Sequence, residues 1–295
     1  MNRKILITGG SGLLGQYLNI ECSSKNKILT CYNNHIGNCN MFQNQKIDIT
    51  DFNEMRVLFS SFEPEIVIHT AAITNTNPLP DQNSKDVYRI NVHATKNIAE
   101  LCETTKAKLI YISTDLVYAG YRGSMLKEDA KLIPVSLYAE TKLMSEQKIK
   151  ETFDNYLILR TALLYGIGLS HSTCHFNKMN DELKNENEVT LFADQFRTPI
   201  SLKESAKIIL QLSQLDIIDE IINVGGIERV SRYELGQILC SVAGYDKSLL
   251  TKNSLYDVPH LPKVEDVSLN TDKLQSVGIK LKTIEENILE IIHEN

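Results

Sequence analysis

A tyrosine and a lysine four residues apart form a pair that could move a proton. Tyr138 and Lys142 bound the segment YAETK, and Tyr138 is the only tyrosine of the chain with a lysine at this spacing. We expect the segment to be helical, so that both side chains share one face with Cβ atoms about 5–6 Å apart. A tyrosine is a poor general acid or base at its ordinary pKa of about 10, but a neighbouring ammonium favours the phenolate and lowers that pKa. The pair therefore predicts acid-base chemistry.

A third hydroxyl group belongs to the same prediction. Thr114 directly follows the predicted strand 108–113. A side chain at the carboxyl end of a parallel strand points into the crevice where ligands bind. We therefore expect the hydroxyls of Thr114 and Tyr138 to converge on one substrate oxygen.

A glycine-rich loop near the N-terminus predicts a binding site for a dinucleotide. The segment GGSGLLG (9–15) follows the first predicted strand and opens a helix. Glycine lets the backbone turn sharply and approach a pyrophosphate, whose charge then rests on the free N–H groups of the helix start. We expect the cofactor to contact Gly9, Gly12, Leu13, Leu14 and Gly15. A tight turn that binds no ligand is the alternative.

The end of the second predicted strand bears on which dinucleotide binds. A carboxylate there would bind the ribose 2′-hydroxyl of NAD. Residues 31–35 read CYNNH and contain neither a carboxylate nor an arginine. A 2′-phosphate meets no repulsion at such an end, so we favour NADP(H) over NAD(H).

Other candidate ligands and thiols predict no further chemistry. His171, Cys174 and His175 lie in a polar stretch without a nearby fourth ligand, so we expect no bound metal. His69 reads as a core histidine. The six cysteines form no C-x-x-C pair and no regular ladder of spacings, which suits isolated reduced thiols and a cytoplasmic protein.

The elements that must position these residues alternate along the first half of the chain. Short apolar runs predict strands, and apolar residues at helical spacing predict the helices between them. Such alternation predicts an α/β fold with a doubly wound parallel sheet of the Rossmann type. We expect a dinucleotide-binding domain over 1–165, a smaller cap that binds substrate over 166–295, and a strand at 220–224 that returns to the sheet. The expected strands of the first half are 4–8, 28–32, 45–48, 65–69, 108–113 and 156–160.

Charge and hydropathy exclude some partners. The 295 residues carry 31 Lys and Arg against 37 Asp and Glu, and the positive residues are scattered. We therefore expect neither a nucleic-acid partner nor a membrane partner. No apolar run reaches the length of a membrane span or of a signal peptide. A homodimer is compatible with the sequence.

The chain resembles extended short-chain dehydrogenases/reductases over essentially its whole length, and among them dTDP-4-dehydrorhamnose reductases and the related regulatory subunit of methionine adenosyltransferase. The motifs that carry the resemblance are GGSGLLG, DI (48–49), HTAA (69–72), Asn91, STDLVY (113–118), YAETK, LRT (159–161) and DQ (194–195).

The resemblance implies roles for individual residues. Asp48 and Ile49 would hold adenine, Ala71 and Ala72 would line the pyrophosphate and the nicotinamide ribose, and Asn91 would belong to the same cofactor site. Thr114, Tyr138 and Lys142 would form the catalytic triad, with Tyr138 and Lys142 also contacting the cofactor.

Three departures from the family patterns bear on the substrate. Dehydratases of this superfamily carry a glutamate where this chain has Leu116, so the base for water elimination is missing. Rhamnose-type reductases usually have tryptophan where this chain has Leu163, and glycine where it has Arg197. The cofactor half matches the family better than the sugar half.

These features predict an NAD(P)H-dependent reductase of a nucleotide-linked 4-keto-6-deoxy sugar, such as dTDP-4-dehydrorhamnose. Two alternatives remain open at this point. One is a dinucleotide-binding regulatory subunit without turnover, like that of methionine adenosyltransferase, and the other is a nucleotide-sugar epimerase with tightly held NAD.

Overall fold

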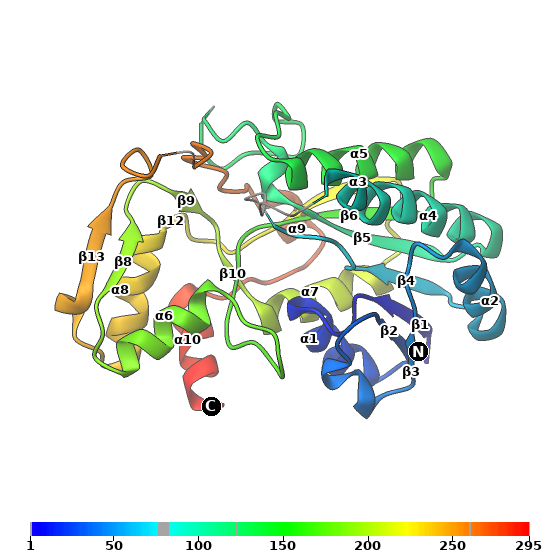
Figure 1. The fold of residues 1–295 in the computed structure, drawn as a ribbon, viewed down its shortest axis with the longest axis horizontal. Helices are drawn as coiled ribbons and strands as arrows, with labels where there is room; N and C mark the ends of the chain where they lie inside the picture. The colour runs from blue at the N-terminus through cyan, green and yellow to red at the C-terminus, as the bar shows by residue number, and fades with distance from the viewer. Residues whose placement is uncertain (1, 76–82, 122, 260, 295) are drawn as a thin grey trace.

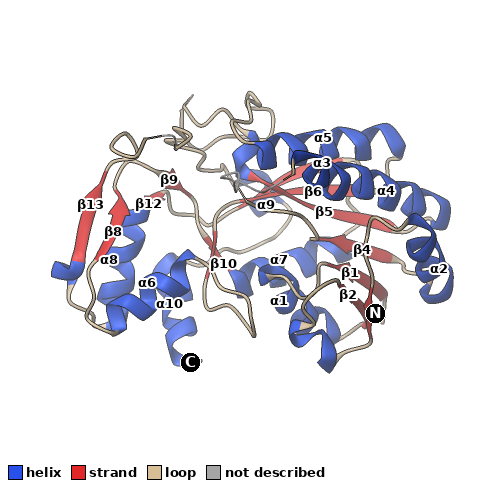
Figure 2. Ribbon diagram, in the orientation of Figure 1, coloured by secondary structure: helices blue, strands red, loops and turns tan. Residues whose placement is uncertain are grey.

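The computed structural model describes residues 2–75, 83–121, 123–259 and 261–294. Two layers of helices enclose a central sheet, and a smaller group of helices and strands stands beside it (Figure 1 and Figure 2). Within the described residues the sheet has seven strands, ordered β11-β6-β5-β4-β1-β2-β3, and every pair is parallel. The predicted α/β fold with a doubly wound parallel sheet is confirmed. The strands are β1 (Lys4–Thr8), β2 (Lys27–Tyr32), β3 (Asn44–Lys46), β4 (Ile66–His69), β5 (Lys108–Thr114), β6 (Tyr156–Thr161) and β11 (Glu220–Val224).

Alternate side chains of the strands face opposite helix layers, as the period of two requires. On β1, Ile5 and Ile7 enter one buried cluster and Leu6 enters the other. The first cluster includes side chains of α1 (Leu13–Ser23), α7 (Leu202–Gln214) and α9 (Asp272–Ser276). The second includes side chains of α2 (Phe52–Phe62), α4 (Ala94–Thr105) and α5 (Leu137–Thr152). Burial on both faces explains why these strands read as continuous apolar runs.

Most predicted strand boundaries agree with the structure within one residue, and the third strand differs. It was expected over 45–48 but spans Asn44–Lys46. As the edge strand, β3 pairs only with β2, along three residue pairs ending at Tyr32 and Lys46. The ladder therefore ends before Asp48, which is left in the loop at the carboxyl edge of the sheet.

Helix α5 begins at a well-formed cap. The Ser136 hydroxyl accepts a hydrogen bond from Ala139 N at 3.2 Å, which fixes the first turn. Helix α4 is preceded by α3 (Ser84–Tyr88) and by a π-helical turn, Arg89–His93. Both helices pack on the same face of the sheet as α2 (Figure 1).

The second half of the chain builds a separate apolar cluster. It packs α6 (His175–Lys184), α8 (Arg232–Ala243) and α10 (Ile284–His293) around β8 (Val189–Phe192) and β13 (Leu250–Asn253). These elements stand to the left of the central sheet in Figure 2. One short strand pair joins the halves, β7 (Leu164–Tyr165) with β10 (Ile200–Ser201). A second pair lies within the second half, β9 (Phe196–Arg197) with β12 (Val230–Ser231).

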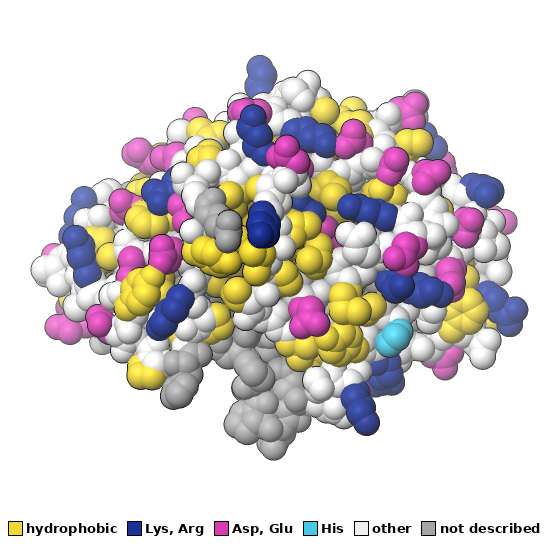
Figure 3. All heavy atoms as spheres, turned by 90° about the horizontal axis from the view of Figure 1, so that it is seen from above, with side chains coloured by type: hydrophobic (Ala, Val, Ile, Leu, Met, Phe, Trp, Pro, Cys, Tyr) yellow, Lys and Arg dark blue, Asp and Glu magenta, His cyan; other side chains and the backbone are white. Residues whose placement is uncertain are grey.

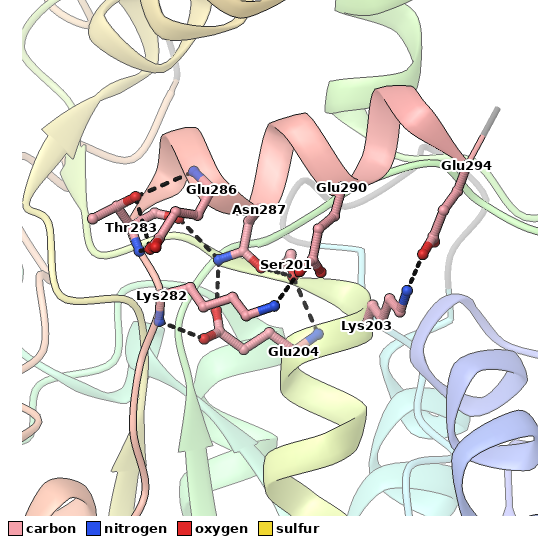
Figure 4. Close-up of polar contacts among 9 residues, drawn as sticks. All are labelled: Ser201, Lys203, Glu204, Lys282, Thr283, Glu286, Asn287, Glu290 and Glu294. Atoms are coloured by element: carbon pink, nitrogen blue, oxygen red, sulfur yellow. Dashed lines mark hydrogen bonds and ion pairs between the residues drawn. The ribbon is translucent and has the colours of Figure 1, made fainter.

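A buried polar network attaches the C-terminal helix to α7 (Figure 4). The Asn287 side chain accepts from the Ser201 hydroxyl at 2.8 Å and donates to a Glu204 oxygen at 2.8 Å. The other Glu204 oxygen accepts from Lys282 N at 2.8 Å. The Thr283 hydroxyl caps α10 by accepting from Glu286 N. The closing helix is therefore held by directional bonds as well as by its apolar face.

Charges of both signs are mixed on the face shown in Figure 3, so this face carries no field of one sign. No helix in the described ranges is both long and apolar enough to cross a membrane.

Candidate active site

A cavity of about 900 Å³ lies at the carboxyl ends of the sheet strands, between the two halves of the chain. Its walls come from the glycine loop, from the loops after β2, β3, β4 and β5, from α5, and from residues of the second half. In an open parallel sheet this edge is where ligands bind. Of the residues predicted from the sequence, the cavity is lined by Gly9, Gly12, Leu13, Leu14, Gly15, Asp48, Ile49, Ala71, Ala72, Thr114, Tyr138 and Lys142.

The glycine loop is packed so closely that three of its positions have no room for a side chain. A Cβ on Gly10 would lie 1.7 Å from Thr30 Oγ1. Gly9 has a φ of +71°, and a Cβ there would lie 2.6 Å from Ala71 N. A Cβ on Gly15 would lie 2.1 Å from Gly9 O. At Gly12 the same test meets only Gly9 O, at 3.1 Å. Gly9, Gly10 and Gly15 thus build the loop, whereas Gly12 faces space that a ligand could take.

Helix α1 offers its first N–H groups to an anion. Its N-cap is Gly12, which has no side chain to cap the helix, and the first turn contains no acidic residue. The initial N–H groups of a helix have no partner within the helix. Together with the positive end of the helix dipole, they fit a pyrophosphate.

The far end of the cavity is bounded by the loops after β2 and β3. Residues 31–35 all line it, as do Asp48 and Ile49. Asp48 Oδ1 accepts hydrogen bonds from Thr50 N at 2.9 Å and from the Thr50 hydroxyl at 2.8 Å. This Asx-type turn fixes the carboxylate at the cavity wall.

Thr114 and Tyr138 meet at the middle of the cavity. Thr114 ends β5, and its hydroxyl donates to Asp115 Oδ1 at 3.1 Å and accepts from Leu116 N at 3.2 Å. Burial and the nearby Asp115 carboxylate raise the pKa of Tyr138 above its ordinary value, while a hydrogen bond with Thr114 opposes the rise. Tyr138 therefore keeps its proton at neutral pH.

This result differs from the expectation that Lys142 would lower the pKa of Tyr138. The Lys142 ammonium lies over the ring of Tyr111, 4.0 Å from the ring centroid. Burial lowers the pKa of Lys142 to about 7, against an opposing contribution from Glu146. The i, i+4 spacing places Lys142 in the same cavity as Tyr138, but burial and Asp115 raise the pKa of the tyrosine.

Two guanidinium groups and one carboxylate stand together on the wall of the cavity. Asp115, Arg197 and Arg232 all line it. Arg197 Nε lies 3.5 Å from Asp115 Oδ2, and both side chains are buried. Burial raises the pKa of Asp115 and lowers the pKa of Arg197. For each charged group, the loss of hydration therefore outweighs the attraction of its partner. The cluster keeps one positive charge in excess.

Asn91 is the one predicted cofactor residue that does not line the cavity. Its side chain is buried and bonds both backbone groups of Ile73, accepting from Ile73 N at 2.8 Å and donating to Ile73 O at 3.0 Å. It also donates to the Thr141 hydroxyl at 3.0 Å. Asn91 thus ties the loop after β4 to helix α5 from behind the cavity wall.

Sequence reasoning did not single out several lining residues. Arg232 begins α8, and it reaches the cavity only because β12 pairs with β9 and brings that helix start beside Arg197. His69, expected in the core, is fully buried and bonds the hydroxyls of Thr8 and Thr95. Across the described ranges, no three His, Cys, Asp or Glu residues are grouped to hold a metal ion. The other lining residues not singled out include Ile47, Ile73, Thr74, Ile90, Phe192, Leu261 and Pro262.

Comparison with known proteins agrees with this architecture. The family described as the RmlD substrate binding domain matches residues 3–295. The chain belongs to this family. The match covers both halves of the chain, and the expected resemblance to extended short-chain dehydrogenases/reductases is confirmed.

Two of the relatives illustrate that differently named proteins match this chain. The β subunit of methionine adenosyltransferase 2 from Pongo abelii is 27% identical over 295 residues, with 96% of this chain and 84% of that protein covered. A dTDP-4-dehydrorhamnose reductase from Aggregatibacter actinomycetemcomitans is 25% identical over 224 residues, with 75% and 71% covered.

Among solved structures, a dTDP-4-dehydrorhamnose reductase from Bacillus anthracis in complex with NADP superposes with a TM-score of 0.86. It is 24% identical, and the alignment covers 100% of this chain and 99% of that one. This likeness establishes the fold.

Proposed function

We propose that this protein is an NAD(P)H-dependent reductase of a nucleotide-linked 4-keto-6-deoxy sugar, such as dTDP-4-dehydrorhamnose. One observation carries the proposal: a single cavity holds a glycine-loop anion site at one end and the Thr114, Tyr138 and Lys142 side chains further along. The name of one reductase relative, which covers 75% of this chain, supports the same reaction class.

The residues present fit a nicotinamide dinucleotide. The uncapped start of α1 and the open side of Gly12 suit its pyrophosphate. Ala71 and Ala72 would line the pyrophosphate and the nicotinamide ribose, and Asp48 and Ile49 would hold the adenine end. When bound, the dinucleotide supplies the hydride for the substrate carbonyl carbon.

The chain's own residues supply the proton. Because burial raises the pKa of Tyr138, its hydroxyl stays protonated and suits a donor to the carbonyl oxygen as that oxygen gains negative charge. The Thr114 hydroxyl can donate to the same oxygen if it leaves Asp115 Oδ1. Lys142 lines the same wall, and its ammonium would bind the ribose and favour the negative charge that develops nearby.

The substrate end of the cavity fits an anionic group. Arg197 and Arg232 carry one positive charge more than Asp115 neutralises, which suits the diphosphate of a nucleotide sugar. Leu116 and Leu163 also line the cavity. Leu116 provides no carboxylate that could act as the base in water elimination, and Leu163 provides no aromatic ring that could stack on the sugar. We propose that residues 1–165 bind the dinucleotide. Residues 166–295 would form most of the cap that binds the substrate.

We further propose a preference for NADPH over NADH. All residues of the CYNNH segment line the cavity, and none is acidic. A 2′-phosphate would therefore meet no repulsive charge from this segment. The dissociation constants of NADPH and NADH, measured by calorimetry, test the preference.

A regulatory subunit without turnover is the second candidate. The relatives named as subunit β of methionine adenosyltransferase 2 match 96% of this chain, whereas the named reductase matches 75%. Co-purification with the catalytic subunit of a methionine adenosyltransferase from the same source tests this candidate. A stable complex together with no turnover would favour it.

The deciding experiment follows NADPH and NADH oxidation at 340 nm against a panel of 4-keto nucleotide sugars. We expect oxidation with at least one 4-keto-6-deoxy sugar nucleotide and none with the matching 4-hydroxy sugar nucleotide. Loss of the signal in Tyr138→Phe separates enzymatic turnover from contaminating activity. No oxidation with any keto sugar, by a protein that binds the dinucleotide, would contradict the proposal.

A further inference from the structure

The ammonium of Lys142 rests on an aromatic ring. Its Nζ lies 4.0 Å from the centroid of Tyr111, a residue of β5 that does not line the cavity. Lys142 is 2% exposed, and within the described ranges its ammonium has no ion pair within 4.0 Å. A cation at this distance from a ring face is attracted by the negative π-face, most strongly where water is excluded.

The charged groups around Lys142 do not stabilise its ammonium in place of the Tyr111 ring. Glu146, one turn further along α5, is occupied by Arg160 at 2.8 Å and by the Ser113 hydroxyl at 2.5 Å. On β4, burial lowers the pKa of His69 to about 3, so this histidine is neutral. Asp115, beyond Tyr138 on the cavity side, is paired with Arg197. The Tyr111 ring is therefore the contact most directly placed to stabilise the ammonium.

Tyr111 is held firmly and is uncharged. It is fully buried in the apolar cluster under α4 and α5, and its ring packs against the His69 ring at a centroid distance of 5.7 Å. Burial raises its pKa well above the ordinary value, which keeps the ring neutral. A leucine at this position would be apolar but would offer no π-face.

We propose that Tyr111 is a positioning residue for Lys142: its ring face holds the ammonium charged and fixed against the cavity wall. The proposal rests on the proposed function for the role of that ammonium in catalysis. The contact itself belongs to the folded chain, so it can be measured without any substrate.

The test replaces Tyr111 with phenylalanine, 4-fluorophenylalanine, pentafluorophenylalanine and leucine in the full chain. Fluorination withdraws the negative charge of the ring face while largely keeping its shape, so the series varies the electrostatic contact with little change in packing. The readout is the pKa of Lys142, from NMR titration of ¹³Cε-labelled lysine, with the resonance assigned by its loss in Lys142→Met. Far-ultraviolet circular dichroism confirms folding.

We expect Tyr111→Phe to keep the pKa of Lys142, and each added fluorine to lower it. Tyr111→Leu should lower it by about one unit relative to phenylalanine. If Tyr111→Leu fails to fold, the fluorinated series still decides the result. An unchanged pKa across phenylalanine, pentafluorophenylalanine and every folded variant would overturn the proposal.

NADPH affinity and turnover give independent readouts. Because the pKa of Lys142 is about 7, NADPH affinity should fall between pH 6 and pH 8 in the wild type, and in the ring-free or fluorinated variants this fall should shift to lower pH. If the pKa of Lys142 follows the fluorine series but no keto sugar is reduced, the positioning role stands and the proposed reductase function fails. If keto sugars are reduced while the pKa of Lys142 stays the same across the fluorine series, the reductase function stands and the positioning role of Tyr111 fails.

Discussion

Asp115 and Arg197 form a buried ion pair on the cavity wall, 3.5 Å apart between Oδ2 and Nε. Asp115 directly follows Thr114 on the end of β5, whereas Arg197 comes from β9 in the second half of the chain. The pair therefore joins the first half of the chain to the second at the cavity wall. In the resemblance to rhamnose-type reductases, the position of Arg197 was expected to hold glycine.

Removing one member of this pair should destabilise the fold. Arg197→Met leaves the Asp115 carboxylate buried without its partner, and we expect a loss of about 3 kcal/mol in the free energy of unfolding. Urea unfolding measures it. Lys148→Met, which breaks the exposed pair with Glu151, is the control and should cost less than about 1 kcal/mol. The double variant Asp115→Asn/Arg197→Met should recover part of the loss, and a purely additive result would show that the two charges do not interact.

Two glycines of the same loop should respond differently to substitution. Gly12→Val should abolish dinucleotide binding and keep the fold, because a Cβ at Gly12 meets only Gly9 O, at 3.1 Å, and points toward the cavity. Gly15→Ala should disrupt the loop itself, since its Cβ would lie 2.1 Å from Gly9 O. Calorimetric titration with NADPH and thermal unfolding separate the two effects. Unchanged affinity in folded Gly12→Val would mean that the loop is only a turn.

The hydroxyl of Tyr138 should matter for turnover and little for nucleotide binding. Tyr138→Phe keeps the ring and removes the proton, so we expect turnover to fall about 10²–10⁴-fold on a confirmed substrate, with NADPH affinity nearly unchanged. Tyr88→Phe removes a hydroxyl that bonds Glu140 outside the cavity and is the matched control. Full activity in Tyr138→Phe would remove Tyr138 as the proton donor.

The buried lysine should make stability rise with pH. The folded pKa of Lys142 is about 7, below its unfolded value near 10.4, so between these values the unfolded chain binds more protons. Stability therefore increases from pH 7 to 10 relative to Lys142→Met, by at most about 5 kcal/mol at 1.36 kcal/mol per pKa unit. Below pH 7 both states are charged and the penalty is fully present. Parallel urea unfolding of both proteins at pH 7, 8.5 and 10 measures the difference, and parallel stabilities across this range would contradict it.

Helix α10 should depend on Asn287. Asn287→Leu removes the bonds to Ser201 and Glu204 and leaves their polar atoms buried, which should cost about 2–4 kcal/mol. Asn185→Leu loses one exposed bond to Asp181 O and should change stability by less than about 1 kcal/mol. Thermal unfolding measures both, and hydrogen exchange at α10 shows whether this helix opens first. Equal effects would mean that the network in Figure 4 adds no stability.

The sequence by itself determined the local features of this protein. Apolar runs buried on both faces produce the strands, and their alternation with helices leaves a right-handed doubly wound sheet as the expected arrangement. The segment GGSGLLG could be assigned to the turn between β1 and α1, because only glycine fits the φ of Gly9 and the contact at Gly15. The i, i+4 spacing placed Tyr138 and Lys142 on one face of α5, since helix geometry is local.

Only the tertiary structure decided how distant residues meet. Arg232 reaches the cavity through the β9–β12 pairing, and Asn91 turns behind the wall because the π-helical turn carries it toward Ile73. The direction of the pKa shift of Tyr138 also could not be predicted from the sequence. Spacing predicted that Lys142 would lower the pKa of Tyr138, but burial and Asp115 raise it, and the Lys142 ammonium rests on Tyr111 instead. Desolvation depends on everything packed around a group, and one chain segment does not contain that information.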